Sequence, residues 1–285
     1  VEGRGTVPMV RARAGMKRVA EILMDRHAGS LRDCAVQAAR ARLADVAAAR
    51  AAPTGRDRAR AAAVLEAVRD ETGRPGAVAI VTLDQTDLAG AANAAREAMA
   101  VFGGLDLVVL NGGISQRSLA MDTVVAVDEQ LMRVNYLSNV AMIKAILPAL
   151  VAQSSAQIAV VSSLVGVIGS PYRSGYAASK HALHGFFDSL RAELPEHVGV
   201  TVLCPGFVKT AVSVNALTGD GSPLGAMDDA QARGLSAEFF AERALAAIAA
   251  RKREVYIAGP ERRAIWLKRF FPGVLARMLR SAKVR

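Results

Sequence analysis

Apolar and polar positions follow two different periods along most of the chain. Short runs that are apolar nearly throughout alternate with longer stretches in which apolar side chains recur every three or four residues. The runs, which predict strands, cover 77–83, 105–110, 156–162, 198–203 and 254–258. The stretches, which predict helices, cover 88–102, 124–151, 174–194 and 236–251. Because strands without polar alternation are buried on both faces, the pattern predicts a doubly wound parallel α/β sheet in a single domain.

Polar or glycine-containing segments follow four of the predicted strands. These strand ends carry Asp84, Asn111, Ser163 and the pair Pro205-Gly206. The carboxyl ends of parallel strands open on one edge of the sheet, and ligands of doubly wound folds bind beyond that edge. We therefore expect the functional site there.

Tyr176 and Lys180 are the first candidates for chemistry at this edge. They are four residues apart on the predicted helix 174–194, so their side chains share one face. A neighbouring ammonium favours the phenolate form of a tyrosine, which suits Tyr176 to general acid catalysis. A Tyr-x-x-x-Lys pair by itself is a weak signal, because chance produces it often.

Two further polar residues accompany this pair. Ser163 ends a predicted strand thirteen residues before Tyr176, where its hydroxyl could hold a substrate carbonyl or simply satisfy the turn. Asn135 lies inside a predicted helix, a position that disfavours asparagine. Asn135 therefore has either a packing task or a catalytic, water-binding one, and the pattern leaves both open.

Together these residues resemble the active-site signature of the short-chain dehydrogenase/reductase family. The matching stretch is Ser162-Ser163 … Tyr176-Ala-Ala-Ser-Lys180, and Asn135 matches the asparagine of the family's catalytic tetrad. The resemblance covers roughly Arg58 to the C-terminus and implies a Rossmann-like fold. It also implies that Tyr176 donates or accepts the proton and that Lys180 assists it. Ser163 would then hold the carbonyl oxygen, and Asn135 would hold a water.

Other motifs resemble the family's dinucleotide-binding elements. Asn111-Gly112-Gly113 is similar to its Asn-Ala-Gly motif, and Pro205 to Thr210 is similar to its Pro-Gly-x-Val-x-Thr motif. The resemblance implies NAD or NADP as cofactor, a carbonyl or alcohol substrate and a homo-oligomer. The apolar C-terminal segment, if it lines the pocket, predicts that this substrate is hydrophobic. The cofactor-binding residues that the resemblance implies are Asp84, Asn111, Gly113, Tyr176, Lys180, Pro205, Gly206, Val208 and Thr210.

Residues 1–57 depart from the family pattern. They contain no strand followed by the family's Thr-Gly-x-x-x-Gly-x-Gly turn, which receives the pyrophosphate at a helix N-terminus. One hypothesis is a reading-frame error, because shifting the codons of residues 24–34 by one nucleotide permits a similar motif; sequencing the coding DNA tests it. The alternative is a catalytically silent relative that binds a ligand without turnover. Arginines at 40, 42, 50 and 56 favour NADP slightly, although a solvated basic helix explains them as well.

Charge divides the chain into three parts: 1–57, a core at 58–260 and a C-terminal segment at 261–285. Of the net charge of +10, residues 1–60 hold 13 basic and 6 acidic side chains, and 261–285 hold 8 basic and one acidic. The core is therefore slightly acidic, which argues against nucleic acid. Residues 261–285 also carry Trp266 and two phenylalanines, which predicts an amphipathic helix on the substrate pocket, on a second subunit or on an anionic membrane surface.

Three remaining features predict little chemistry. Cys34 and Cys204 match no metal-ligand spacing, which predicts free thiols and no metal site. Neither His181 nor His184 has a carboxylate at a suitable spacing, which predicts surface or packing roles. The apolar stretch at 139–153 is interrupted and too short to cross a bilayer. With no targeting segment visible, we expect a cytoplasmic protein with possible peripheral membrane contact.

Overall fold

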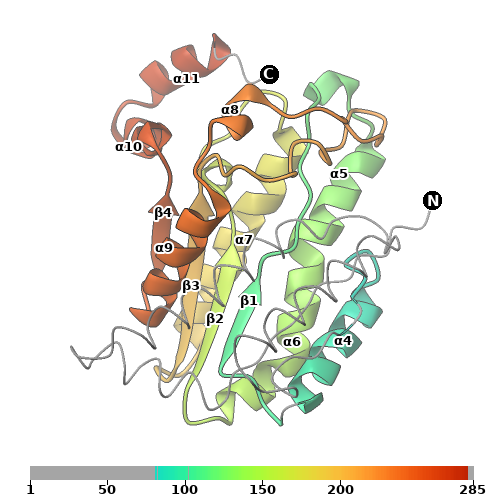
Figure 1. The fold of residues 1–285 in the computed structure, drawn as a ribbon, viewed down its shortest axis with the longest axis vertical. Coiled ribbons are helices and arrows are strands. Elements are labelled where there is room, and N and C mark those ends of the chain that lie inside the picture. The colour runs from blue at the N-terminus through green and yellow to red at the C-terminus, as the bar shows by residue number, and fades with distance from the viewer. Residues whose placement is uncertain (1–80, 82, 102, 282–285) are drawn as a thin grey trace.

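A parallel sheet forms the centre of the computed structural model, which describes residues 81, 83–101 and 103–281 (Figure 1). Its strands are β1 (Leu107–Leu110), β2 (Ala156–Val161), β3 (Val198–Pro205) and β4 (Glu254–Ile257). They are hydrogen-bonded in the order β1-β2-β3-β4, and every pairing is parallel. These four strands confirm the sequence prediction. The predicted strand 77–83 lies almost wholly outside the described residues, although Val81 and Leu83 are buried in the core.

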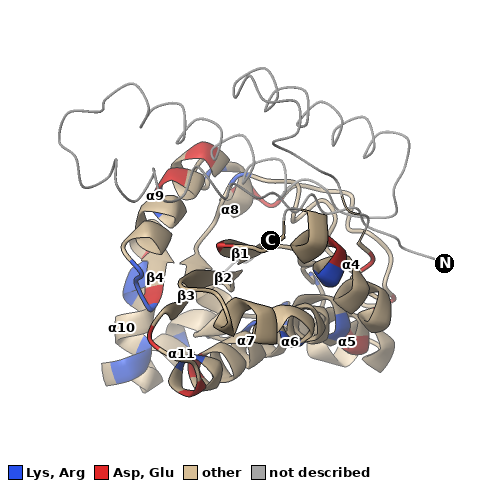
Figure 2. Cartoon of the chain, turned by 90° about the horizontal axis from the view of Figure 1, so that it is seen from below, with Lys and Arg blue, Asp and Glu red and all other residues tan. Residues whose placement is uncertain are grey.

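Successive residues of each strand point to opposite faces of the sheet, and each face is covered. Ile158 and Val160 of β2 enter a core with α4 (Leu88–Val101), α6 (Ser138–Val151) and α7 (Ser174–Glu193). Ala159 and Val161 enter a second core with α9 (Ala237–Ala249) on the other face. Figure 2 shows α6 and α7 on one side of the strands and α9 on the other. The fold is therefore the doubly wound α/β sandwich that the apolar strands predict.

Local sequence sets the ends of several helices. The Asp87 side chain accepts the N–H of Gly90 at the start of α4, and the Ser236 hydroxyl accepts the N–H of Phe239 at the start of α9. Helix α7 ends at Glu193, because Leu194 must be extended before Pro195. These stop and start signals explain why the predicted helix bounds agree with the observed ones to within two residues.

The predicted helix 124–151 contains a turn of different geometry. It consists of α5 (Val125–Met132), the π-helical turn η2 (Arg133–Leu137) and α6. The whole stretch Val125–Val151 is long and apolar enough to cross a membrane by length and composition, which the sequence analysis did not anticipate. Core helices pass the same test. Here Ile143 and Leu150 are fully buried, so this stretch is a core helix of the domain.

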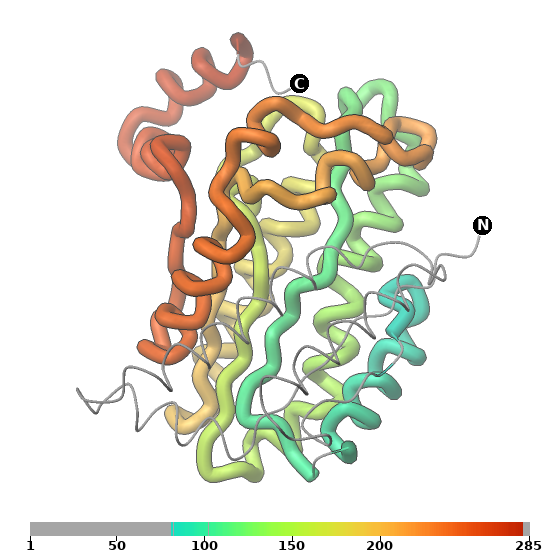
Figure 3. Tube along the Cα trace, viewed as in Figure 1, coloured from blue at the N-terminus to red at the C-terminus, as the bar shows by residue number. Residues whose placement is uncertain are grey.

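The segment between β3 and α9 crosses the carboxyl ends of the strands. It contains the short helix α8 (Asp229–Ala232) and lies beside the segment between β1 and α5, as the orange and green tubes of Figure 3 show. Backbone bonds join the two segments: Arg117 N donates to Leu217 O, and Leu217 N donates to Ser115 O, both at 2.8 Å. The edge where the site is expected is thus covered by two segments that are hydrogen-bonded to each other.

The C-terminal segment forms two helices, α10 (Arg263–Phe270) and α11 (Pro272–Arg280), where the sequence predicted one. The break falls at Phe271, because a residue before proline is disfavoured in helical geometry, while Pro272 is well suited to begin the next helix. Both helices leave the body of the sandwich (Figure 1). The predicted boundary at 57 and the tract before it lie outside the described residues.

Candidate functional site

Lys180 occupies the centre of the strand-end site. Its side chain is buried, and Nζ donates to the carbonyl of Val161 at the end of β2 with an N–O distance of 2.8 Å. A Cβ atom placed on Gly113 would lie 3.4 Å from this Nζ and 2.8 Å from Asn135 Oδ1. Gly113 is therefore required by close approach, and the structure brings together three residues that are far apart in sequence.

Asn135 links this group to the rest of the site. Its Oδ1 accepts the N–H of Ile114 at 2.7 Å, and its Nδ2 donates to the Ile114 carbonyl and to Ser179 Oγ, both at 2.9 Å. The backbone carbonyl of Asn135 accepts from Asn139 Nδ2 at 2.7 Å. The π-helical turn directs this buried side chain across to α7, a use of π-turns that is common at functional sites. Asn135 thus fastens the segment after β1 to the helix of Tyr176.

Tyr176 stands in the first turn of α7. Lys180 Nζ lies 5.9 Å from the centroid of its ring, as the four-residue spacing predicts. The start of this helix is held by Gln116, whose Oε1 accepts the N–H of Gly175 at 2.9 Å and that of Tyr176 at 3.3 Å. Because helix-start N–H groups have no partner within the helix, the buried Gln116 amide fixes where Tyr176 stands.

Ser163 stands two residues after the end of β2 and begins the short helical turn η3 (Leu164–Gly166), which packs against α7. Its Oγ accepts the N–H of Val165 at 3.2 Å, so the hydroxyl satisfies the turn, one of the two roles considered for it. A hydroxyl that accepts here still has its own proton to donate to another group. The neighbouring Ser162 instead donates to the carbonyl of Lys180.

The residues expected to bind a dinucleotide also lie at strand ends. Asn111 follows β1, and its Nδ2 is buried with no hydrogen-bond partner among the described residues. Gly206 follows β3, and its N–H donates to the carbonyl of Ile257 at 3.0 Å. Val208 and Thr210 stand on the segment after β3, whereas Asp84 closes its own turn by accepting from Thr86 N and Oγ1.

A buried ion cluster joins the segment between β1 and α5 and the segment between β3 and α9 to the start of α7. Arg117 Nε donates to Asp228 Oδ2 at 2.7 Å, and Arg173 lies 3.5 Å from the same oxygen. Arg117 also donates to Ser115 Oγ, while the Arg173 guanidinium stands over the ring of Phe207. Burial, followed by the charge of Arg117, lowers the pKa of Arg173 to about 10, so Arg173 remains charged at neutral pH. The cluster therefore carries a net positive charge close to Tyr176.

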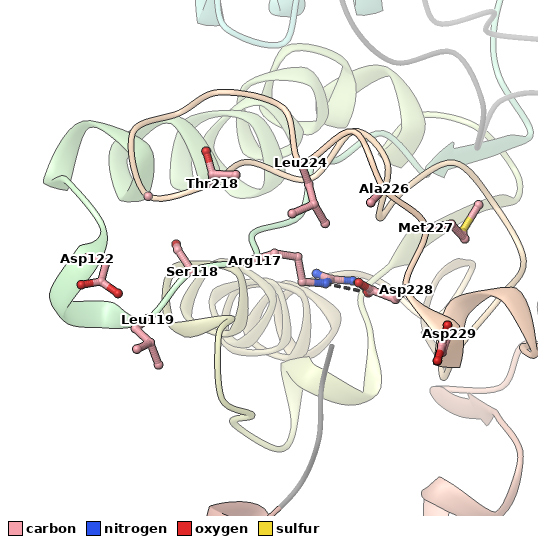
Figure 4. A pocket seen from close by; sticks show the side chains of 11 residues that line it. Arg117, Ser118, Leu119, Asp122, Thr218, Leu224, Ala226, Met227, Asp228 and Asp229 are labelled. Carbon is pink, nitrogen blue, oxygen red and sulfur yellow. Dashed lines mark hydrogen bonds and ion pairs between the residues drawn. The ribbon is translucent and has the colours of Figure 1, made fainter.

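A cavity of about 500 Å³ lies beside this cluster (Figure 4). Arg117 and Asp228 point toward each other at its edge, and apolar side chains of Leu119, Leu224 and Met227 line it. No described residue of 261–281 lines this cavity, and the interpretation that 261–285 packs on the substrate pocket stays a prediction. The exposed aromatic side chains of α10 and α11 face away from the core instead.

Sequence analysis did not identify Gln116, Ser179 or the ion cluster. The hydrogen bonds of Gln116 to Gly175 and of Ser179 to Asn135 join residues that are 59 and 44 positions apart. Arg117 and Asp228 are 111 residues apart, so no spacing rule pairs them. His184 was expected to lack a carboxylate partner, and this is wrong: Glu254 approaches its Nδ1 to 3.8 Å, because parallel pairing of β3 and β4 brings Glu254 beside α7.

Comparison with known proteins identifies the family. Residues 36–220 match the family model of the short chain dehydrogenases. Dehydrogenase/reductase SDR family member 7B of Bos taurus is 42% identical over 203 residues, which are 70% of this chain and 62% of that protein. The Danio rerio relative of the same name is 38% identical over 246 residues, or 85% and 80% of the two chains. The chain thus spans less than two thirds of the Bos taurus relative's length.

Solved structures share the fold at low sequence identity. A short chain dehydrogenase/reductase from Burkholderia phymatum, in complex with NAD, superposes with a TM-score of 0.66 at 21% identity, covering 76% of this chain and 83% of its own. One from Burkholderia cenocepacia, in complex with NADP, gives 0.58 at 23% identity, covering 71% and 78%. With the family model and the relatives in agreement with the geometry of the site, this chain belongs to the short chain dehydrogenase/reductase family of oxidoreductases.

Proposed function

We propose that this chain is an NAD(P)-dependent oxidoreductase that interconverts a carbonyl and an alcohol, with Tyr176 as its general acid and base. The observation that carries the proposal is the placement of Tyr176 beside the Lys180 ammonium, at the strand-end edge of the sheet. In this role the bound dinucleotide supplies or accepts the hydride. The chain's own residues supply orientation, charge and the proton.

The described residues divide the remaining work. The Tyr176 hydroxyl donates its proton to the carbonyl oxygen in reduction and takes it back in oxidation. The Lys180 ammonium favours the phenolate that this transfer leaves, because opposite charges attract more strongly in a buried site. Ser163 Oγ, with a proton to donate, holds the same substrate oxygen. Asn135 and Gln116 keep Lys180 and Tyr176 in place.

The described part of the site fits the nicotinamide side of a dinucleotide. Asn111 offers a buried amide N–H group without a partner, and Gly113 leaves room beside Lys180. The segment in which the family places its pyrophosphate turn and the arginines that favour NADP lie outside the described residues. NAD and NADP in the two Burkholderia structures support a nicotinamide dinucleotide here without choosing between them. The catalytically silent alternative predicts that the pyrophosphate side cannot bind.

A calorimetric titration of the full chain with NADPH and then NADH tests the proposal. We expect one of them to bind, and the Gly113→Ala variant to bind it about 5- to 150-fold more weakly. The reason is that the new Cβ displaces Asn135 and Lys180, and such overpacking costs about 1–3 kcal/mol. Gly112→Ala is the matched control, because its Cβ meets only the end of the flexible Gln85 side chain. A folded wild-type chain that binds neither dinucleotide contradicts the proposal and supports the silent alternative.

We also propose that α10 and α11 dock on an anionic membrane surface. Trp266, Phe270 and Phe271 are about half exposed and pack their rings together, with centroid distances of 5.0 and 5.6 Å from Trp266. Basic residues accompany them along both helices, and Figure 2 shows the blue of lysine and arginine on α10. Exposed aromatic rings beside cationic side chains are typical of helices that lie in a lipid interface. The core at 58–260 is slightly acidic, so it does not share the positive charge of this segment.

Flotation with liposomes measures this contact. We expect the full chain to float with liposomes containing anionic lipid and to remain in solution with neutral ones, with less binding at high salt because charge attraction is screened. The Trp266→Ser/Phe270→Ser variant should lose most of the bound fraction. Val101→Ser, an exposed apolar position on α4, should retain it. Equal flotation of both variants would show that these rings do not make the contact.

A further inference from the structure

Three side chains of metal-ligating types converge between α7 and the sheet, and the proposed reaction uses none of the three. His184 of α7, Cys204 of β3 and Glu254 of β4 offer one ligand atom each, and these atoms all lie within 4.8 Å of one another. Cys204 Sγ is 3.7 Å from His184 Nε2 and 3.8 Å from Glu254 Oε1. Their sequence separations of 20 and 50 residues match no ligand motif, so only the fold reveals the cluster.

We propose that His184, Cys204 and Glu254 bind a single divalent transition-metal ion, with Zn²⁺ as the ion that their chemistry favours. Thiolate, imidazole and carboxylate are the three ligand types of protein zinc sites. Tetrahedral bonds of about 2.0–2.3 Å place ligand atoms about 3.4–3.8 Å apart, which is close to the separations found here. The two negative charges of a thiolate and a carboxylate also balance the charge of one divalent cation, so the buried complex would carry no net charge.

The groups around the cluster fit a cation. Tyr256 donates its hydroxyl to Glu254 Oε1, which orients the carboxylate as an outer-shell partner would. Asp188, one helical turn after His184, adds negative charge nearby. Burial lowers the pKa of His184, and the Lys180 ammonium lowers it further, against the charges of Glu254 and Asp188. Neutral imidazole is the form that ligates a metal.

The unequal exposure of the three side chains makes the cluster accessible to solvent from one side. Cys204 is completely buried, whereas the side chains of His184 and Glu254 are 15% and 31% exposed. A metal ion would therefore enter past Glu254 and meet the thiol last. Burial and the Glu254 carboxylate raise the pKa of the Cys204 thiol, so without a metal it is a neutral donor, and a bound ion would replace its proton. Three protein ligands leave a fourth position for water.

Such an ion would connect α7, β3 and β4 directly. Helix α7 carries Tyr176 and Lys180, and β3 leads from Cys204 into Pro205 and Gly206. The bound ion is therefore expected to raise the thermal unfolding temperature of the chain, since a ligand that binds only the folded state stabilises it. This inference rests on the cluster alone, so it holds whether or not the chain reduces a carbonyl.

Titration of the chelator-treated full chain with Zn²⁺, and with Co²⁺ as a spectroscopic probe, tests the site. We expect one equivalent to bind, with a thiolate-to-cobalt charge-transfer band and a higher unfolding temperature. Loss of an outer-shell partner alone weakens metal binding about 10- to 100-fold, so Cys204→Ala and Glu254→Gln should each weaken it by more than about 100-fold. Only Cys204→Ala should also remove the band.

The controls separate this site from other ligands of the chain. His181→Gln removes a histidine of the same helix whose Nδ1 bonds the Ala177 carbonyl, and Cys34→Ser removes the other thiol. Both variants should bind Zn²⁺ as the wild type does. The proposal is overturned if the folded wild type binds no ion tightly, or if binding and the cobalt band survive in Cys204→Ala. Glu254→Gln keeps the test valid if Cys204→Ala does not fold, since Glu254 is partly exposed.

Discussion

Replacing Tyr176 with phenylalanine is expected to lower kcat/KM for carbonyl reduction by about 100- to 10,000-fold, the range that general acid catalysis contributes. The substitution removes one hydroxyl and leaves the ring beside Lys180, so the ring's packing against Leu131 and Leu217 should persist. Cofactor affinity should change much less than turnover. A rate effect without a matching loss of binding is the signature of a group that acts on the transition state.

The assay follows NAD(P)H oxidation over a panel of apolar aldehydes and ketones, with calorimetric cofactor binding measured on the same samples. Tyr136→Phe is the matched control. It removes the hydroxyl of a partly buried tyrosine that lies on the π-helical turn and packs its ring against Phe186 of α7. That variant should keep the wild-type rate. Undiminished reduction by Tyr176→Phe would rule out the proposed mechanism. A folded wild-type chain that neither binds the cofactor nor turns over any substrate would favour the silent relative.

Asp228→Asn is expected to lower the free energy of unfolding by about 3–5 kcal/mol, the usual cost of breaking a buried ion pair from one side. Arg117 and Asp228 are 3% and 7% exposed, so water cannot replace the lost carboxylate charge. Arg173 shares the same oxygen, and the variant would leave two buried guanidinium groups facing each other. The loss should therefore exceed that of a surface salt bridge, which is worth at most about 1 kcal/mol.

Urea unfolding followed by circular dichroism gives the comparison. Asp229→Asn is the control, because it removes the same charge from the adjacent, exposed position and should change the free energy by less than about 0.5 kcal/mol. The segment that carries Asp228 also borders the cavity, so the variant should raise KM in addition. Equal stability of the two variants would mean that Arg117 and Arg173 find other partners when the carboxylate is gone.

Hydrophobic periodicity in the sequence was enough to predict the layers of this protein and the sheet edge where its chemistry is expected. Continuous apolar runs predicted five parallel strands, of which the described residues confirm four, and the three- to four-residue period predicted the helices that cover them. Both signals are local, because burial on two faces or one is written into neighbouring residues. The pair Tyr176 and Lys180 was also predictable, since its four-residue spacing holds within a single helix. The dinucleotide-binding roles of the strand-end residues stay predictions.

The contacts between residues that are far apart in the sequence could be identified only from the tertiary structure. The π-helical turn that carries Asn135 to Ser179, the amide of Gln116 at the start of α7 and the ion pair of Arg117 with Asp228 have no periodic signal. The same holds for His184, Cys204 and Glu254, which strand pairing and the packing of α7 on the sheet bring together. Periodicity reports how a residue faces its own element, whereas these contacts depend on how elements pack against one another.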